Sequence, residues 1–518
     1  MALSATFHSL PLAKRPQDRR AVSFAPAPGT PVVEQPRHVA VVGGGIAGLA
    51  AAAALAERGV SVVLYEAQPQ AGGRVRSWPL ADGRNMSRGF HAFFRQYYNL
   101  RALLRRADPD LDRLTPIADY PLTTSGGLTD SFARIPRSTP WNLIGFVLRS
   151  PSFPLRALPK VNIKAALELI QADFPATFEH YTGESAAEFL DRLRFPHEAR
   201  HLALEVFARS FFANPRDFSA AELVAMFHTY FTGSGEGLLF DVPDDDYDTA
   251  LWAPLVSYLT SLGVEVRLAD PVQRITVLDE HSSQWQVASV SHPDGELYDA
   301  VVLAADPRIA RKFIADLDTP ALQSGRGANW SQAVARQQNA PAFGVLRIWY
   351  DGEVAADRPA FLGTSGYGSL DNISVLERFE TSARMWADQH EGSVVELHAY
   401  ALTTSDPQKV RADLLAQLHR VYPETAELGV VAEDLRIDDD CALITPEQWS
   451  ARPGVATPLR GLVLAGDWVR CDLPVALMER AATTGFLAAN RLLKSWGVAG
   501  HEVHSPPLQG ILRHRARK

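Results

Sequence analysis

Cysteine is scarce in this chain of 518 residues, which contains only Cys441 and Cys471. Two cysteines exclude a disulfide framework and a thiolate metal cluster, and they favour a reducing cytoplasm. No group of histidine, cysteine and acidic residues has the spacing of metal ligands, so we expect no metal site.

An excess of positive charge is also missing, because 51 basic residues face 59 acidic ones and the formal net charge is -8. This balance gives no support for a nucleic-acid-binding surface, and we expect no nucleic acid partner. No apolar run reaches the roughly 18 residues of a transmembrane helix. Hydrophobic residues make up 46% of the chain, which is typical of globular proteins.

A strand, a glycine turn, a helix and a second strand are predicted between Val39 and Glu66. Gly43, Gly45 and Gly48 form the pattern G-x-G-x-x-G, which permits a tight turn and a close approach of pyrophosphate to the backbone. Glu66 ends the second strand, where a carboxylate can accept hydrogen bonds from a ribose. The stretch predicts a dinucleotide site but does not distinguish NAD from FAD.

Two basic motifs follow the second strand. Gly73 and Arg74 come directly after it, and the arginine can reach pyrophosphate oxygens with its planar group of donors. A predicted hairpin over residues 78 to 86 leads to RGFHAFF, which contains Arg88, His91 and three phenylalanines. This segment either lines a cofactor, or His91 is a core residue in an apolar run.

A second strand–glycine–helix unit lies near the other end of the chain. A strand over residues 462 to 465 leads to Gly466 and Asp467, and a helix is predicted from about Ala476 to Leu493. The N–H groups of a helix N-terminus beside Gly466 would face an electron-rich group, and Asp467 would accept a ribityl hydroxyl. We expect both units to share one sheet and to hold one large ligand.

Residues 131 to 167 contain no acidic residue and mix basic with aromatic side chains. This composition suits either a membrane surface or an amphipathic helix pair that packs on the core. Residues 205 to 240 are rich in phenylalanine and are interpreted as the wall of an apolar tunnel or as ordinary core. The basic residues of the first stretch are Arg134, Arg137, Arg149, Arg156, Lys160 and Lys164.

The two ends of the chain are interpreted as unstructured. Residues 1 to 36 are rich in proline, alanine and serine, which predicts a disordered lead-in. Arg19 and Arg20 are typical of an export signal, but the prolines that follow argue against an apolar signal segment, and a transit peptide stays open. Residues 499 to 518 are predicted to form a basic, solvated tail.

Four motifs, VVGGGIAGL, AGGRVRS, AGDW and LMERAATTGFLAA, resemble the FAD-dependent amine oxidase and phytoene desaturase superfamily from residue 37 to about residue 495. RGFHAFFRQYYNL is most similar to the carotenoid ring desaturase/methyltransferases of the isorenieratene synthase type. Arg480 stands where the pattern usually has glycine. Met86 to Gly89 replace an acid-and-glycine pattern of many amine oxidases, which counts against an amine substrate.

The resemblance implies an α/β fold with a Rossmann-like FAD-binding domain of the glutathione reductase type 2 and an inserted α+β substrate-binding domain. The FAD-binding domain would comprise residues 37–120, 250–330 and 455–498, and the substrate-binding domain residues 121–249 and 331–454.

The resemblance also implies roles for individual residues. His91, Arg88 and Glu479 are the catalytic candidates. The predicted cofactor-binding residues, which would hold FAD, are Gly43, Gly45, Ala47, Gly48, Glu66, Gly73, Arg74, Val266, Asp467 and Met478.

The implied activity is an FAD-dependent conversion of the β-ionone ring of β-carotene to an aromatic ring, with a 1,2-methyl shift and electrons passed to an acceptor such as a quinone. A carotenoid substrate implies a peripheral position on the cytoplasmic face of a membrane. The alternatives are another FAD-dependent polyene desaturase, an amine oxidase, and a prenyl-protein escort of the GDI type without flavin catalysis. Glu66, Arg74 and Asp467 together favour bound flavin.

Overall fold

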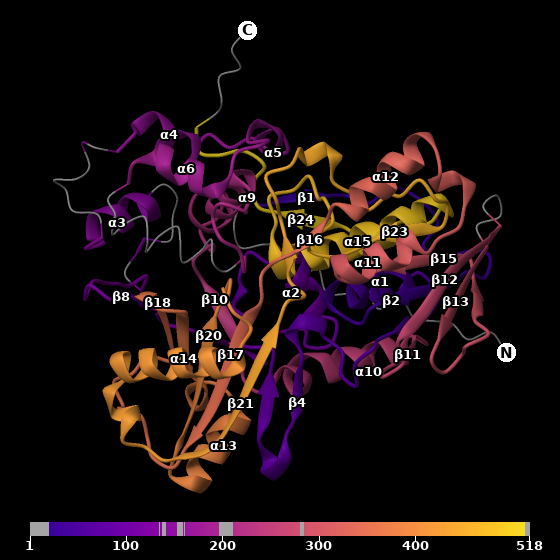
Figure 1. Cartoon of the computed structure of the whole chain (residues 1–518). Coiled ribbons are helices and arrows are strands. Elements are labelled where there is room, and N and C mark those ends of the chain that lie inside the picture. The colour runs from indigo at the N-terminus through magenta and orange to yellow at the C-terminus, as the bar shows by residue number, and fades with distance from the viewer. Residues whose placement is uncertain are drawn as a thin grey trace.

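The chain forms two domains that lie side by side, one around a parallel sheet and one around a large antiparallel sheet (Figure 1). The computed structural model describes residues 20–133, 135–136, 141–152, 159, 161–195, 211–279 and 284–512.

The first domain is built on a parallel sheet of five strands in the order β11-β3-β2-β15-β23. Its central strands are short apolar runs that are buried on both faces, as expected for a parallel sheet between helices. The strands come from widely separated parts of the chain, so both ends of the sequence meet in one sheet, as predicted. They are β2 (His38–Val42), β3 (Ser61–Tyr65), β11 (Glu265–Arg267), β15 (Ala300–Leu303) and β23 (Leu462–Leu464).

Helix α1 (Ile46–Ala56) begins directly after the glycine turn, and all of its residues are buried. It packs against α15 (Leu477–Ser495), the long helix that follows β23. A Cβ atom on Gly485 would lie 2.3 Å from the carbonyl oxygen of Ala47, so only glycine permits this close crossing. The other helices of the domain are α2 (Tyr98–Leu104), α10 (Ala253–Ser261), α11 (Pro307–Ala315) and α12 (Gly325–Ala335).

Small antiparallel sheets flank this domain. The predicted hairpin over residues 78 to 86 is confirmed as β4 (Ser77–Pro79) paired with β5 (Asn85–Ser87). A three-stranded sheet contains β12 (Val272–Asp279), β13 (Gln284–Ser289) and β14 (Glu296–Tyr298).

The two ends of the described chain pair with each other. Strand β1 (Val22–Phe24) is antiparallel to β24 (Val503–Ser505), so these residues belong to the fold. The prediction of a disordered lead-in is therefore wrong for β1, and the prediction of a solvated tail is wrong for β24. Local composition cannot reveal a strand whose partner lies some 480 residues away in the chain.

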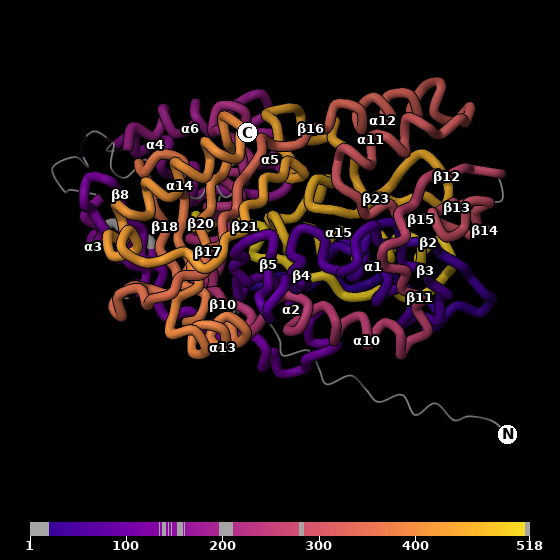
Figure 2. Tube along the Cα trace, turned by 60° about the horizontal axis from the view of Figure 1, so that its bottom comes forward, coloured from indigo at the N-terminus to yellow at the C-terminus, as the bar shows by residue number. Residues whose placement is uncertain are grey.

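The second domain contains a seven-stranded sheet in the order β21-β17-β20-β19-β18-β8-β9. The β17 and β20 strands are buried along their whole length, and α13 (Thr381–His390) and α14 (Pro407–Val421) pack beside the sheet (Figure 2). The pairs are antiparallel except β18 with β8. The strands are β8 (Leu122–Thr124), β9 (Thr129–Asp130), β17 (Phe343–Tyr350), β18 (Phe361–Tyr367), β19 (Leu370–Val375), β20 (Ser393–Ala399) and β21 (Val430–Asp438).

Short helices between residues 141 and 227 cover the top of this domain in Figure 1. Small sheets join the two domains: β6 (Phe93–Phe94) and β7 (Leu114–Pro116) pair with β10 (Phe240–Pro243), and β16 (Gln338–Asn339) pairs with β22 (Ala442–Leu443). The helices are α3 (Trp141–Arg149), α4 (Ile163–Glu168), α5 (Ala176–His180), α6 (Ala186–Leu193) and α9 (Ala220–Phe227).

Several residues of the predicted membrane segment and tunnel lie outside the described residues. Among the residues that the structure describes, none belongs to a helix with the length and hydropathy needed to span a membrane. The predicted residues outside the description are Arg134, Arg137, Phe153, Arg156, Lys160 and Phe207.

The crossing of α1 and α15 predicts a stability effect. Gly485→Ala forces a methyl group against the backbone of Ala47, so we expect a loss of about 1–3 kcal/mol of stability and a lower melting temperature. Gly126→Ala is the matched control, because the nearest atom to its new Cβ lies 3.7 Å away. Thermal unfolding measures both, and equal melting temperatures for the two variants would contradict the assigned packing.

Candidate active site

One cavity of about 620 Å³ extends from the glycine turn of the first domain to the large sheet of the second. Its lining changes along its length from backbone and charged groups to phenylalanine and tyrosine rings. A cavity that joins two domains in this way is a typical ligand site.

The glycine turn forms the dinucleotide end of this cavity. Gly43, Gly45 and Ala47 line it, together with Glu66 at the end of β3. The Oε2 atom of Glu66 accepts a hydrogen bond from the amide of Gly44 at 2.7 Å, and Oε1 accepts one from the amide of Gln68 at 2.8 Å. Burial raises the pKa of Glu66. The carboxylate is therefore held by backbone donors at the position predicted for ribose recognition.

Arg74 and Asp467 bring the two ends of the chain together at the cavity. The guanidinium of Arg74 donates to Asp467 at 2.6 Å across 393 residues of sequence. Met478 lies in the first turn of α15, and no described side chain caps this helix. The first N–H groups of α15 are thus without a side-chain acceptor at the cavity, as suits an electron-rich ligand group.

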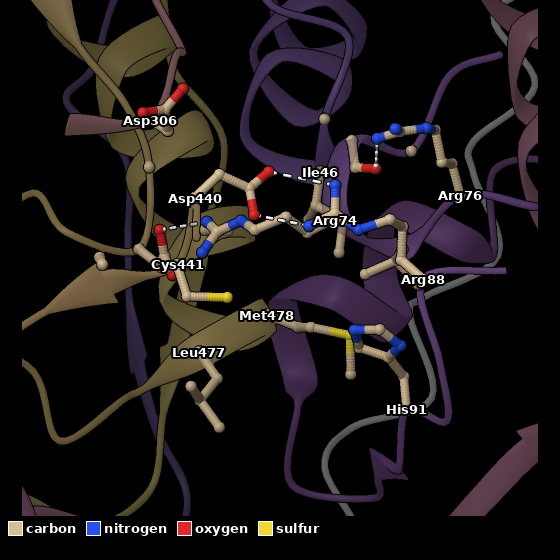
Figure 3. A pocket seen from close by; sticks show the side chains of 18 of the residues that line it. Ile46, Arg74, Arg76, Arg88, His91, Asp306, Asp440, Cys441, Leu477 and Met478 are labelled. Carbon is tan, nitrogen blue, oxygen red and sulfur yellow. Dashed lines mark hydrogen bonds and ion pairs between the residues drawn. The ribbon is translucent and has the colours of Figure 1, made fainter. Parts of the chain in front are cut away.

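Arg88 is almost fully buried and is held by two acidic residues. It donates to Asp440 at 2.5 and 3.1 Å and lies 3.2 Å from Asp438. Burial alone would raise the pKa of Asp440, but the charge of Arg88 and its hydrogen bonds outweigh this effect and lower it. Arg88 therefore presents a neutralised ion pair at the cavity wall (Figure 3).

His91, just before β6, and Met478, in the first turn of α15, line the same cavity (Figure 3). Nδ1 of His91 lies 2.7 Å from the carbonyl oxygen of Gly89. A carbonyl only accepts, so Nδ1 carries the proton and Nε2 keeps a lone pair, for which the described residues provide no donor. Burial lowers the pKa of His91 to about 4, so the ring is neutral at neutral pH.

The far part of the cavity is lined by aromatic rings. Four members of the predicted phenylalanine-rich tunnel segment are among them, namely Phe211, Phe212, Tyr230 and Phe240. Phe218, Phe227 and Phe231 of the same segment are buried elsewhere, as ordinary core residues. Both interpretations of the segment therefore apply to different residues. Other phenylalanine and tyrosine rings of the lining include Phe90, Phe94, Tyr97, Tyr120, Phe343, Phe361 and Tyr400.

Three of the predicted site residues, Gly48, Val266 and Glu479, are not among the residues that line the cavity. Gly48 packs against the glycine turn, where a Cβ atom would lie 1.9 Å from the carbonyl oxygen of Gly43. Val266 lies in β11, beside Leu64 of β3. The carboxylate of Glu479 accepts hydrogen bonds at 2.9 Å from the amides of Asn99 and Leu100, at the start of α2. This geometry favours a structural role for Glu479.

Sequence reasoning missed a group of polar residues at the far end of the cavity. Glu396, His398 and Tyr400 follow one another at every second position at the end of β20, so they share one face of the strand. His398 and Tyr400 line the cavity, and the carboxylate of Glu396 contacts Nε2 of His398. In the sequence, this face is visible as the alternating Glu, His and Tyr of ELHAY. The same alternation occurs in ordinary buried strands, so the spacing alone does not indicate a site.

The dinucleotide end fits FAD. Gly43 has φ of +112°, and a Cβ atom there would lie 2.5 Å from the carbonyl oxygen of Ala304. A Cβ atom on Gly73 would lie 3.0 Å from Cα of Gly45, so glycine at this position lets the loop after β3 lie directly against the glycine turn. The start of α1, which has no side-chain cap, and the carboxylate of Glu66 are groups that would suit pyrophosphate and ribose.

Comparison with known proteins identifies similar sequences. The family model of flavin containing amine oxidoreductases matches residues 46–493. The carotenoid phi-ring synthase of Streptomyces griseus is 50% identical to this chain and aligns over 96% of this chain and 97% of its own length. The carotenoid phi-ring synthase of Chlorobaculum tepidum is 26% identical over 92% of this chain and 91% of its own length.

Solved structures share the fold. Putrescine oxidase bound to putrescine superimposes with a TM-score of 0.62 at 17% identity, over 89% of this chain and 99% of its own. Cyclohexylamine oxidase from Brevibacterium oxydans has the same TM-score at 15% identity and the same coverage. At these identities the likeness concerns the fold alone, and it confirms the predicted Rossmann-like architecture.

The contacts of Glu66 predict its effect on cofactor affinity. Glu66→Gln replaces an acceptor oxygen by an NH₂ group that faces a backbone donor, so we expect FAD to bind about 10- to 100-fold more weakly. Titration of the apoprotein with FAD, followed by flavin fluorescence, measures this change. Glu265→Gln is the matched control on the exposed edge strand β11, and an unchanged affinity for Glu66→Gln would contradict the assignment.

Proposed function

Because the chain belongs to the flavin-containing amine oxidoreductase family, we propose that it converts a β-ionone ring of a β-carotene-like substrate to an aromatic ring with a 1,2-methyl shift. The chain is a flavin-dependent oxidoreductase, and its cofactor is FAD. The similarity to carotenoid phi-ring synthases supports modification of a carotenoid ring. The observation that carries the proposal is the single cavity that joins the FAD end to a chamber of aromatic side chains.

The proposed conversion removes two hydrides and two protons from each ring. FAD, when bound, supplies the hydride acceptor. The protein must bind the hydrocarbon, exclude water and stabilise the cation from which the methyl group migrates. Phe90, Phe94 and Phe361 line the chamber, and the face of an aromatic ring attracts a cation. No strong nucleophile is required.

His91 is suited to accept one of the two protons. Its Nε2 lone pair is available because Nδ1–H donates to Gly89, whose carbonyl also accepts from the hydroxyl of Tyr247 at 2.8 Å. These contacts fix the tautomer. A substrate cation is a strong acid, so a neutral imidazole is a sufficient base even though burial lowers its pKa.

The substrate assignment is tested with the purified protein in detergent, with a quinone as electron acceptor. We expect β-carotene to yield a product whose mass and absorbance report aromatic rings. An acyclic carotene and an amine are the alternative substrates in the same panel. Recovery of unchanged β-carotene by protein that carries FAD would contradict the proposal, and turnover of either alternative would replace it.

The pKa of His91 predicts the pH dependence of the reaction. A base with a pKa of about 4 stays neutral above that pH, so activity should be flat between about pH 5 and pH 8 and fall as pH drops through about 4. His91→Gln should slow aromatic product formation about 100-fold. Initial rates across this range provide the measurement, and an inflection near the ordinary histidine pKa of about 6.5 would contradict the assigned environment.

The proposal includes a peripheral position on a membrane, at the cytoplasmic face. Trp141, Ile144 and Leu148 lie at positions i, i+3 and i+7 of α3, and Trp141 and Leu148 are 60% and 65% exposed. Ile163 on α4 is 70% exposed and is followed by Lys164. Exposed apolar side chains beside basic ones suit the interface of an anionic membrane, from which a carotenoid and a quinone are both accessible.

This surface predicts vesicle binding. The double substitution Trp141→Ser and Leu148→Ser should weaken binding to vesicles of anionic lipid at least tenfold, or by about 1.4 kcal/mol. Co-sedimentation with vesicles measures the affinity. Met385→Ser on α13 is the control, since Met385 is 68% exposed at another place on the surface. Equal binding by the double variant and the parent would contradict the proposed contact.

A further inference from the structure

A continuous chain of hydrogen bonds leads from the aromatic chamber into the large sheet. The hydroxyl of Tyr400 lies 2.8 Å from Nδ1 of His398, and Nε2 of His398 lies 2.9 Å from Oε1 of Glu396. The amide of Asn372 donates to the same hydroxyl at 3.0 Å. Since Asn372 donates to the oxygen of Tyr400, the phenol proton is directed to His398.

His398 has a partner for each of its two neutral tautomers. When Nε2 carries the proton, it donates to Glu396, and Nδ1 accepts from Tyr400. When Nδ1 carries the proton, Nε2 accepts from the backbone amide of Phe90 at 3.0 Å. An imidazole that is supported in both forms can take up a proton at one nitrogen and release one from the other.

The charge state of Glu396 suits the acceptor end of this chain. Arg347 donates to its Oε2 atom at 2.9 and 2.7 Å. Burial alone would raise the pKa of Glu396, but Arg347 and His398 outweigh that effect and lower it to about 2. A carboxylate that stays ionised stabilises an imidazolium at His398.

Beyond Glu396, the chain reaches a second, smaller cavity. This cavity measures about 20 Å³, enough for a water molecule, and its lining includes Glu396, Glu380, Asp245 and Asp246. Burial raises the pKa of Glu380 to about 7, against the opposing effect of Arg347. The small cavity thus lies behind the acceptor end of the relay, but the transfer proposed below ends at His398 and does not require Glu380 to change its protonation state.

We propose that Tyr400, His398 and Glu396 form a proton relay that accepts one of the two ring protons, separately from His91; the proposal rests on the proposed function. In the step, a C–H bond of the methyl-shifted ring cation breaks, and its electron pair becomes the last π bond of the arene. The proton passes to the oxygen of Tyr400 while the phenol proton moves to Nδ1 of His398. The positive charge thereby moves from the substrate to an imidazolium beside Glu396.

The state of Tyr400 agrees with this role. Burial raises the pKa of Tyr400, so its hydroxyl is protonated at the start of the step. The ring packs edge-on against Phe212, with 5.0 Å between the centroids, and both residues line the chamber. Together with His91, Tyr400 gives the lining two proton acceptors, and the proposed reaction releases two protons from different ring carbons.

Tyr400→Phe tests the relay, because it removes the hydroxyl and keeps the ring. With β-carotene and a quinone under anaerobic conditions, the first bleaching of the flavin reports removal of the first hydride, whereas the aromatic product, which requires reoxidation of the flavin by the quinone, reports the final proton loss. We expect product formation to slow about 100-fold, while the first bleaching phase stays within about twofold of the parent. His398→Asn should also slow product formation while the first bleaching phase stays near that of the parent, because it interrupts the hydrogen-bond relay but keeps Tyr400.

Tyr350→Phe is the matched control, because this buried tyrosine of β17 has no hydrogen-bond partner for its hydroxyl among the described residues. Product formation by Tyr400→Phe at the parent rate would overturn the relay. An equal slowing of flavin bleaching and product formation would also overturn it, because it would indicate a structural role for Tyr400. If the parent itself forms no aromatic product, the proposed function fails and the relay fails with it. If the parent is active and Tyr400→Phe is unaffected, only the relay fails.

Discussion

The close crossing of α1 and α15 is the constraint on which the site depends. Gly485 allows the two helices to approach at Ala47, and Gly48 lets α1 lie against the glycine turn. These contacts bring the first and last nucleotide-binding segments to one edge of the parallel sheet. Arg74 and Asp467, which are 393 residues apart in sequence, meet there as an ion pair.

From this edge the lining of the cavity changes from polar to aromatic, which matches the two proposed ligands, FAD and a carotenoid. Backbone amides, Glu66 and the ion pairs of Arg74 and Arg88 surround the end that suits FAD. Aromatic rings from both domains surround the other end, where a hydrocarbon can be buried away from water. Among the polar residues of the lining, His91, His398 and Tyr400 are each oriented by specific hydrogen bonds, while Nε2 of His91 stays available to the substrate.

The sequence predicts those parts of the fold that depend on local patterns. The glycine turn, the apolar parallel strands, the hairpin over residues 78 to 86 and the final helix all have short-range signals, and the structure contains each of them. The pairing of β1 with β24 and the capping of α2 by Glu479 depend on partners far away in the chain, so composition could not reveal them. The face formed by Glu396, His398 and Tyr400 was visible as an alternation, but its meaning depends on the cavity that the fold places beside it.

The most direct test of the account follows the two geminal methyl groups. β-Carotene that carries a ¹³C label in both geminal methyl groups of its ring is incubated with the protein and a quinone, and the product is analysed by NMR. We predict that both labels are retained on an aromatic ring, one on the original carbon and one on the neighbouring ring carbon. An aromatic product that has lost one label, or one in which neither labelled methyl group has moved to the neighbouring carbon, would contradict the proposed methyl shift.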